Sequence, residues 1–154
     1  FPTLELRIAD ACPQLQDALC IAGLFRAMLA YALDAPHDDW FDDPLTRILT
    51  VENRWRAKRR GLRGLFIEPR SQSTLPFAVW LDQALACIAE QIAPEDRWIM
   101  VHARKLARIG GSAEAQLGLY RRARSRGADQ RTAVCQVVDR LLCQTALQDV
   151  GQIA

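Results

Sequence analysis

The residue pattern near the start of the chain places the strongest constraint on its fold. Residues 3–10 (TLELRIAD) alternate strictly between aliphatic and polar side chains, and Glu5 and Arg7 share the polar face. A period of two is typical of a half-buried strand. A lone strand is not stable, and the chain offers few pairing partners beyond the region of Leu65. We therefore expect the strand to join a sheet that lies upstream of Phe1 or in another chain.

The rest of the chain is patterned mainly for helices. Pro44 and Gly61 bound one helix, and the segment 65–67 predicts a short strand or irregular hairpin. Gly127 is a plausible helix end, and Ser112 a plausible helix cap. The expected helices cover residues 14–33, 44–60, 76–92, 94–107, 112–127 and 128–147. Helical spacing predicts buried faces made of Leu45, Ile48 and Trp55 in the second helix and of Val134, Val138, Leu141 and Leu142 in the last.

Composition is typical of one soluble globular domain. The chain has 154 residues, of which 50% are hydrophobic and 25% charged, with a mean hydropathy of -0.07. The apolar run 18–33 contains Arg26 and is shorter than the roughly 20 residues of a spanning helix, so we expect a buried core helix and no membrane partner. The net charge of +2 gives no strong overall attraction to nucleic acid.

The five cysteines predict a reducing environment. Their number is odd and no C-x-x-C pair occurs, which argues against a disulfide framework or a zinc site. We expect them to be small buried hydrophobic residues of a cytoplasmic protein.

Glu5 and Arg7 are the first candidate site. Residues two apart on one strand face lie about 6.5–7 Å apart, a separation that suits a carboxylate on Mg²⁺ and a guanidinium on a phosphoryl group. The alternative is a solvated strand face with an ion pair worth under about 1 kcal/mol.

The segment ENRWRAKRRG (52–61) is the second candidate site. Asn53, Arg56 and Arg60 fall on one helical face, with Arg59 beside them. Such a face suits phosphates, carboxylates or a nucleic-acid backbone, because the guanidinium is a planar fork of donors. The alternative is a solvated basic helix end, where cations favour the helix dipole. Other polar groups are interpreted as structural: His102, the turn GADQR (127–131) with Asp129 starting a helix, and the exposed loop residues His37, Asp38, Asp39, Asp42 and Asp43.

Three stretches together resemble one protein family. FPTLELRIADACPQLQDALCIAGLFRAM, ENRWRAKRRGLRG and GADQR are similar, in order and spacing, to the C-terminal half of the glutamate–cysteine ligase type 2 family, which includes bacterial carboxylate–amine ligases. The motif E-[LV]-R followed three residues later by Asp is the most specific part, and residues 69–108 match only as generic helices.

The resemblance implies an α+β fold and an ATP-dependent reaction. The chain would be a mostly helical C-terminal segment (1–154) of one ligase catalytic domain, whose N-terminal strand belongs to a glutamine-synthetase-like antiparallel sheet. The family forms amides from a carboxylate and an amine through an acyl phosphate, with ATP and Mg²⁺. By position, Glu5 would bind Mg²⁺, Arg7 would be the catalytic contact to the phosphoryl group, and Asn53 and Arg59 would bind substrate. Arg60 departs from the family's usual Tyr and receives no role.

The family's N-terminal acidic strand and its His-containing strand are absent from this sequence. We therefore expect a fragment that is inactive alone, with amino-acid or carboxylate and amine substrates and the missing N-terminal half as partners. A homo-oligomer is an open alternative. Nucleic acid is not an expected partner of the ligase, but the rival interpretation is a non-catalytic helical module that binds an acidic partner or RNA through residues 54–60.

Overall fold

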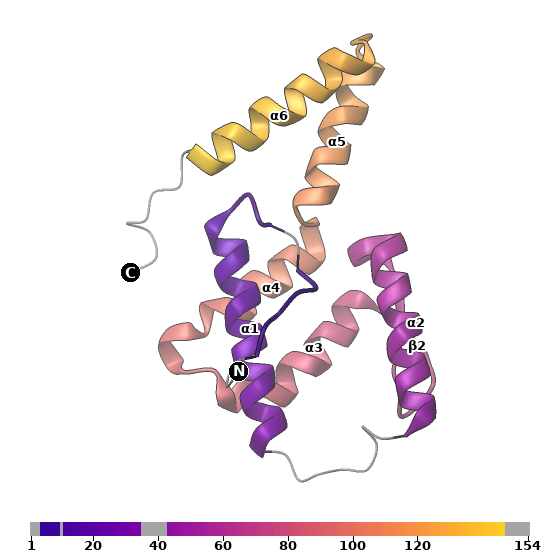
Figure 1. The fold of residues 1–154 in the computed structure, drawn as a ribbon, viewed down its shortest axis with the longest axis vertical. Coiled ribbons are helices and arrows are strands. Elements are labelled where there is room, and N and C mark those ends of the chain that lie inside the picture. Colours follow the sequence, from indigo (N-terminus) through magenta and orange to yellow (C-terminus); the bar gives the residue numbers. More distant parts are fainter. Residues whose placement is uncertain (1–3, 10, 35–42, 147–154) are drawn as a thin grey trace. The chain divides into compact units, whose positions relative to one another are not determined.

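The computed structural model describes residues 4–9, 11–34 and 43–146. Within these ranges the chain is mostly helical, with one small two-stranded antiparallel sheet (Figure 1). The α-helices and strands are α1 (Leu15–Asp34), α2 (Pro44–Arg60), β1 (Leu65–Ile67), β2 (Thr74–Pro76), α3 (Phe77–Ile88), α4 (Trp98–Ile109), α5 (Ser112–Ser125) and α6 (Gln130–Ala146). Short 3₁₀ turns cover Gly61–Arg63, Ala89–Gln91 and Pro94–Asp96. These features confirm an α+β chain dominated by helices.

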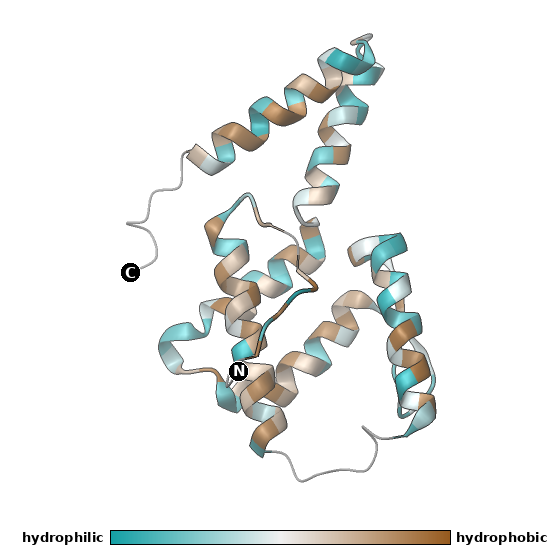
Figure 2. Cartoon of the chain, viewed as in Figure 1, coloured by the Kyte–Doolittle hydropathy of each residue, from teal (hydrophilic) through white to brown (hydrophobic). Residues whose placement is uncertain are grey.

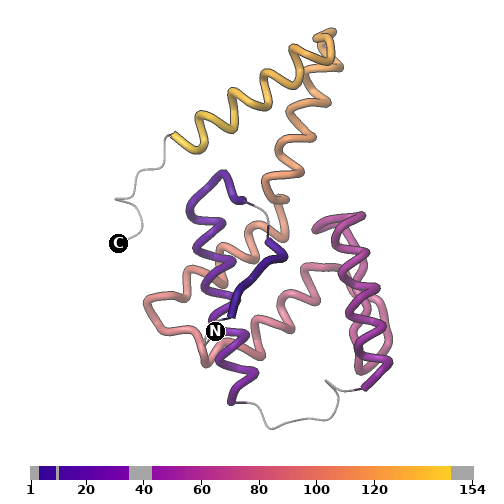
Figure 3. The backbone as a smooth tube through the Cα atoms, in the orientation of Figure 1, coloured from indigo at the N-terminus to yellow at the C-terminus, as the bar shows by residue number. Residues whose placement is uncertain are grey.

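The chain divides into two compact units, which we call unit 1 (Phe1–Ala22 with Gly110–Ala154) and unit 2 (Gly23–Ile109). The core of unit 2 joins the β1–β2 hairpin to α3 and packs α3 against α4. Phe66 of β1 is buried, and its ring centroid lies 5.4 Å from that of Phe77 on α3. The backbone trace in Figure 3 shows the hairpin beside α2, which contacts β1. The outer edge of β1 is therefore covered by a helix.

Unit 1 is built mainly from the consecutive helices α5 and α6, which contact each other. Ala123 and Ala133 are its most deeply buried helix-pair residues, at 4% and 0% exposure. In Figure 1 the two helices meet at the turn that joins them and diverge away from it. Small side chains at the contact let the two backbones approach closely near the turn, and a groove opens where they diverge.

The predicted N-terminal strand is absent from the described residues. Residues 4–9 have no regular secondary structure, and Leu4 and Ile8, which the alternation placed on a buried face, are 68% and 64% exposed. A strand is defined by its hydrogen bonds to a neighbour, and β1 and β2 pair with each other instead. The glutamine-synthetase-like sheet expected around this segment is likewise not seen in the described ranges.

Helix α1 differs from the expected buried core helix. It has the predicted position and is coloured mainly apolar in Figure 2, yet only 22% of its most apolar window is buried. By length and composition it is the one described helix that meets the criteria for crossing a membrane, which core helices and N-terminal leader segments also meet. Its second half, from Gly23 onward, belongs to unit 2, where Ile99 lies against Gly23 and Arg26 forms an ion pair with Asp96.

Helix α2 begins and ends where the sequence predicts. Asp43 caps its first turn by accepting a hydrogen bond from the backbone N–H of Thr46 at 2.8 Å, and this bond lowers the pKa of the Asp43 carboxyl. Pro44 occupies the first helical position, where its missing N–H is harmless. Gly61 ends the helix with a φ of 56°, a left-handed value that glycine adopts without strain.

The packed face of α2 was predicted wrongly. Leu45, Ile48 and Trp55 are 42%, 63% and 55% exposed, whereas Thr46 and Asn53 are on the covered side. The neighbour of α2 is the edge of strand β1, which presents backbone N–H and C=O groups. Polar side chains satisfy such an edge and aliphatic ones do not, so the polar face of α2 packs inward.

The packed face of α6 was also predicted wrongly in most positions. Val134, Val138 and Leu142 are 46%, 47% and 63% exposed, while Ala133 is fully buried. One residue corresponds to a rotation of about 100° around a helix. The contact with α5 is therefore centred on a small alanine, one position away from the larger apolar residues.

The turns that bound α5 confirm two expectations and correct one. Gly111, not Ser112, is the N-cap, and Ser112 is the first residue of the helix. Gly127 follows the end of α5 with a φ of 90°. Asp129 starts α6 by accepting a hydrogen bond from the backbone N–H of Thr132 at 2.7 Å.

All five cysteines are free thiols, as predicted, but they are not all buried. Cys20 is 1% exposed, and burial, with smaller contributions from Asp17 and Cys12, raises the pKa of its thiol to about 11. Cys12 is half-buried, and the exposed thiols are Cys87, Cys135 and Cys143. The first of these three lies on α3 and the other two on α6, so helical context did not predict burial.

Candidate functional site

Glu5 and Arg7 lie together in unit 1. Arg7 Nε donates a hydrogen bond to Glu5 Oε2 at 2.8 Å, so the two charged side chains are in contact although residues 4–9 form no strand. The Glu5 side chain is 66% exposed and the Arg7 side chain is 82% exposed, so water screens the ion pair. Such a pair is worth under about 1 kcal/mol, and a stronger ligand for either partner would displace it.

Asn53 lies in unit 2 and binds the backbone of strand β1. Its Nδ2 donates to the carbonyl oxygen of Ile67 at 2.7 Å, and its Oδ1 accepts from the N–H of Ile67 at 2.8 Å. This amide supplies the two bonds that a third strand would make with that residue. A side-chain amide has two donor hydrogens and two acceptor lone pairs, so one hydrogen on Nδ2 and one lone pair on Oδ1 are not used by these two bonds.

Arg56 lies one turn further along the same face of α2. Its Nε donates to Glu52 Oε1 at 2.7 Å, and its Nη1 donates to the carbonyl oxygen of Leu65 at 3.1 Å. The arginine is thus fixed between a carboxylate of its own helix and the start of β1. The sequence placed Arg56 beside Asn53 on one face but did not predict that the partner of this face is a strand.

Arg59 belongs to the exposed basic end of α2. Lys58, Arg59 and Arg60 form the last turn, where positive charge complements the partial negative charge of the helix end. In the described part of the chain, Arg59 makes no ion pair or side-chain hydrogen bond with another residue. Its guanidinium is therefore available to an anionic group, whereas the amide of Asn53 is largely occupied by β1.

The described residues contain no group of three or more His, Cys, Asp or Glu side chains that would hold a metal ion by themselves. His102 is buried, and its ring lies 6.2 Å from that of Trp98 in an edge-on arrangement, as expected for a structural histidine. Asp43 caps α2, and the other members of the acidic loop, His37, Asp38, Asp39 and Asp42, lie outside the described residues. Glu5 is thus a single carboxylate that needs further ligands to hold a metal.

The predicted site residues fall into two groups. Glu5 and Arg7 are brought together within unit 1, and Asn53 and Arg59 lie on one helix within unit 2 but differ in surroundings. The sequence missed a third polar region, a groove between α5 and α6, because its residues come from two helices with no shared motif.

The model of the glutamate–cysteine ligase family 2 matches residues 1–137. A protein of Ectopseudomonas mendocina named "Putative glutamate–cysteine ligase 2" is 62% identical over 154 residues, which are 100% of this chain and 41% of the relative. Proteins of the same name from Rhodospirillum rubrum and Pseudomonas entomophila are each 40% identical, over 94% of this chain and 38% and 37% of the relatives. No solved structure matches.

The chain spans about two fifths of the length of these curated relatives and matches their C-terminal part. The family match covers both candidate sites and most of the α5–α6 pair. On this evidence, the chain belongs to the glutamate–cysteine ligase family 2.

Proposed function

We propose that the chain is the C-terminal part of a single catalytic domain of a cytoplasmic, ATP-dependent carboxylate–amine ligase, which joins glutamate to cysteine or a related pair of substrates. The observation that carries the proposal is the family match over residues 1–137, which includes the Glu5–Arg7 pair. The relatives named for this activity are about two and a half times longer than this chain, so the proposal includes an N-terminal partner segment.

The proposed chemistry is the activation of a carboxylate as an acyl phosphate, followed by attack of the amine. ATP supplies the phosphoryl group, and Mg²⁺ neutralises charge on its oxygens when both are bound. Glu5 would contribute one hard oxygen ligand to the metal, and Arg7 would contact the transferring group. The weak, exposed ion pair between them suits these roles, because it costs little to separate the two side chains when their ligands arrive.

Helix α2 would border the substrate pocket. Arg59 has an unengaged guanidinium suited to a carboxylate or phosphate, so we assign it the direct contact. Asn53 holds the helix against β1, so its effect on substrate binding would come mainly from positioning, with one donor hydrogen left for a direct contact.

The test uses the chain joined to the N-terminal part that the curated relatives possess. Amide formation from glutamate and cysteine, followed by ADP release, should fall by orders of magnitude in Glu5→Gln and Arg7→Ala, while Lys105→Gln, an exposed change on α4, should leave it unaltered. Circular dichroism should show an unchanged fold in all three variants. Near-normal turnover in either of the first two variants would contradict the proposed roles.

Arg59→Ala should raise the KM for one substrate, and Arg54→Ala is its matched control, because both side chains are exposed on α2. The chain alone should show no turnover, since it holds one candidate metal ligand in the described ranges. Turnover by the chain alone would show that the N-terminal part is dispensable and would refute the proposal of a fragment.

A second candidate function is supported by the exposed cations that follow one another at the end of α2. Arg54, Lys58, Arg59, Arg60 and Arg63 are all exposed. A helical module using this surface would bind RNA or an acidic protein without ATP, with affinity that falls steeply as salt rises. A salt titration with a single-stranded RNA separates the two functions, because the ligase requires no such binding.

A further inference from the structure

The turn between α5 and α6 fixes the angle at which the two helices leave it. Gly127 takes a φ of 90°, and the N–H of Ala128 reaches back to the carbonyl oxygen of Ala123 at 3.1 Å, a pattern that closes a helix end. Arg124 Nη1 donates to the carbonyl oxygen of Ala128 at 2.9 Å, and Asp129 caps α6. Hydrogen bonds thus hold both sides of the turn, and they fix the angle at which the two helices diverge.

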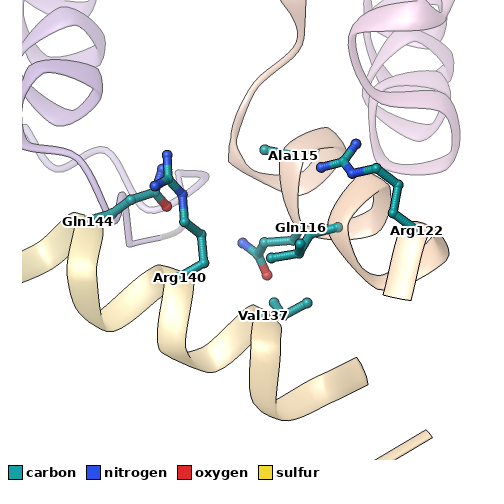
Figure 4. Close-up of a pocket in the computed structure, with 7 residues that line it drawn as sticks. Ala115, Gln116, Arg122, Val137, Arg140 and Gln144 are labelled. Carbon is teal, nitrogen blue, oxygen red and sulfur yellow. The ribbon is translucent and has the colours of Figure 1, made fainter. Parts of the chain in front are cut away.

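The divergence opens a groove of about 280 Å³ between the helices. Its floor is apolar and its sides carry two arginines and two glutamines, one of each from either helix (Figure 4). The lining residues are Ala115, Gln116, Leu119 and Arg122 from α5, and Val137, Arg140 and Gln144 from α6. None of these described lining residues is acidic, and each helix contributes one arginine to the groove.

The two arginines approach the groove from opposite helices. In Figure 4 their guanidinium groups lie on either side of Gln116. Arg122 lies back along its own helix, and its Nη1 would be 3.3 Å from a Cβ at Gly118. A glycine inside a helix costs about 1 kcal/mol relative to alanine, so this one weakens α5 at the position that gives the guanidinium its space.

Neither guanidinium has an acidic partner among the residues that the structure describes. In the part of the chain that the structure describes, Arg122 and Arg140 make no ion pair and their side chains donate no hydrogen bond. Arg122 and Arg140 line the same groove, and the repulsion between their like charges is relieved when an anion binds there. Gln116 and Gln144 add side-chain amide groups to the same opening.

We infer that this groove binds a small organic anion, whose carboxylate or phosphate contacts Arg122 and Arg140 while its carbon skeleton rests on Leu119 and Val137. The volume lies at the lower end of ligand pockets, which limits the ligand to about the size of an amino acid or a triose phosphate. The inference is independent of the proposed ligase chemistry, because it involves neither Glu5 and Arg7 nor helix α2.

The test measures binding of two probes to the intact chain by isothermal titration calorimetry and by NMR shifts of the α5 and α6 amides. Glutarate represents the carboxylate source, glycerol 3-phosphate the phosphate source, and glycerol is the uncharged control. We expect at least one anion to bind and glycerol not to bind. Arg122→Gln and Arg140→Gln should each weaken binding about tenfold, a typical effect of losing one charge-assisted hydrogen bond.

Arg121→Gln is the matched control, because it removes the same charge from an exposed neighbouring position outside the groove. Its affinity should stay within twofold of the unchanged chain. Ala115→Trp provides a second test without any change of charge, since the exposed alanine at the groove can be enlarged with little strain, and it should abolish binding.

Equal losses in all three arginine variants would overturn the inference in favour of diffuse charge attraction. Absence of binding of both anions at tens of millimolar would also overturn it. Binding that survives Ala115→Trp would place the ligand elsewhere and have the same consequence.

Discussion

Replacing Asn53 by alanine removes the clamp between α2 and β1, and the structure fixes the size of the expected effect. The change deletes two hydrogen bonds, at 2.7 and 2.8 Å, and leaves the N–H and C=O of Ile67 without their partners. A buried backbone group left unpaired costs about 1–3 kcal/mol. Ile67 is half-buried, so water replaces part of the loss, and alanine gains up to about 0.7 kcal/mol of helix propensity. We expect a net destabilisation of about 2 kcal/mol.

The assay is native-state hydrogen exchange at the amide of Ile67, which reports the opening of this junction directly. Because about 1.4 kcal/mol corresponds to a factor of ten, exchange should become roughly 30-fold faster in Asn53→Ala. Asn53→Asp keeps the acceptor for the Ile67 N–H and loses the donor to the Ile67 carbonyl oxygen. Its exchange rate at Ile67 should therefore lie between those of the unchanged chain and of Asn53→Ala. Arg54→Ala, on the exposed side of α2, should change exchange by less than threefold.

The reasoning is refuted if Ile67 exchanges at the same rate in Asn53→Ala and in Arg54→Ala. That result would mean that the amide contributes nothing to the junction and is free for another role. Combined with kinetics of the proposed full-length ligase, the same variant distinguishes the two assignments of Asn53. A positioning residue loses stability and substrate affinity together, whereas a pure substrate contact raises KM without faster exchange at Ile67.

Two further predictions concern the contact of α1 with α4 and the start of α6. Gly23→Ala should lower the free energy of unfolding, measured in urea, by about 1–2 kcal/mol. A Cβ at this position collides with the Cδ1 of Ile99, which is 2% exposed, and this overpacking outweighs the higher helix propensity of alanine. Adding Ile99→Val to Gly23→Ala should restore at least half of the lost stability. The N–H of Thr132, and then its hydroxyl, lower the pKa of the Asp129 carboxyl, so the stabilisation of α6 by this cap is complete above about pH 4 and is lost as the pH falls through the lowered value. The protection factor of the Thr132 amide, which is its exchange rate relative to the intrinsic rate at the same pH, should therefore fall on acidification below that pH. In Asp129→Asn the protection factor should be nearly independent of pH.

Element boundaries could be predicted from the sequence because their causes are local. Pro44 and Gly61 bound α2 through a missing N–H and a left-handed backbone, and Gly127 and Asp129 separate α5 from α6 in the same way. A short strand or irregular hairpin around residues 65–67 was also predicted from its flanking turn residues, and the structure has an antiparallel hairpin there. None of these features requires knowledge of what packs against the element.

Packing faces could not be predicted, because the rule used for them assumes an apolar neighbour. It holds for α3, where Leu81, Leu85 and Ile88 are buried, and it fails for α2, whose neighbour is the polar edge of β1. Helical spacing places Asn53 on one face of α2 with Arg56 and Arg60, but it does not reveal that the partner of the Asn53 amide is Ile67, 14 residues further along the chain. The identity of the partner, rather than the pattern of the helix, decided which side turned inward.

The candidate site shows the same difference between local and long-range causes. The alternation in residues 4–9 correctly placed Glu5 beside Arg7, because that relation depends only on spacing within the segment. It did not produce a strand, because strand formation depends on hydrogen bonds to a second segment that the described chain does not offer. The alternation would leave Leu4 and Ile8 exposed in any arrangement without a covering layer, as observed. The pattern of this segment calls for a pairing partner and its charged pair is only weakly held, so in the proposed ligase this segment would depend most on the N-terminal part. The orientation of Glu5 and Arg7 in the proposed active site would follow from that pairing.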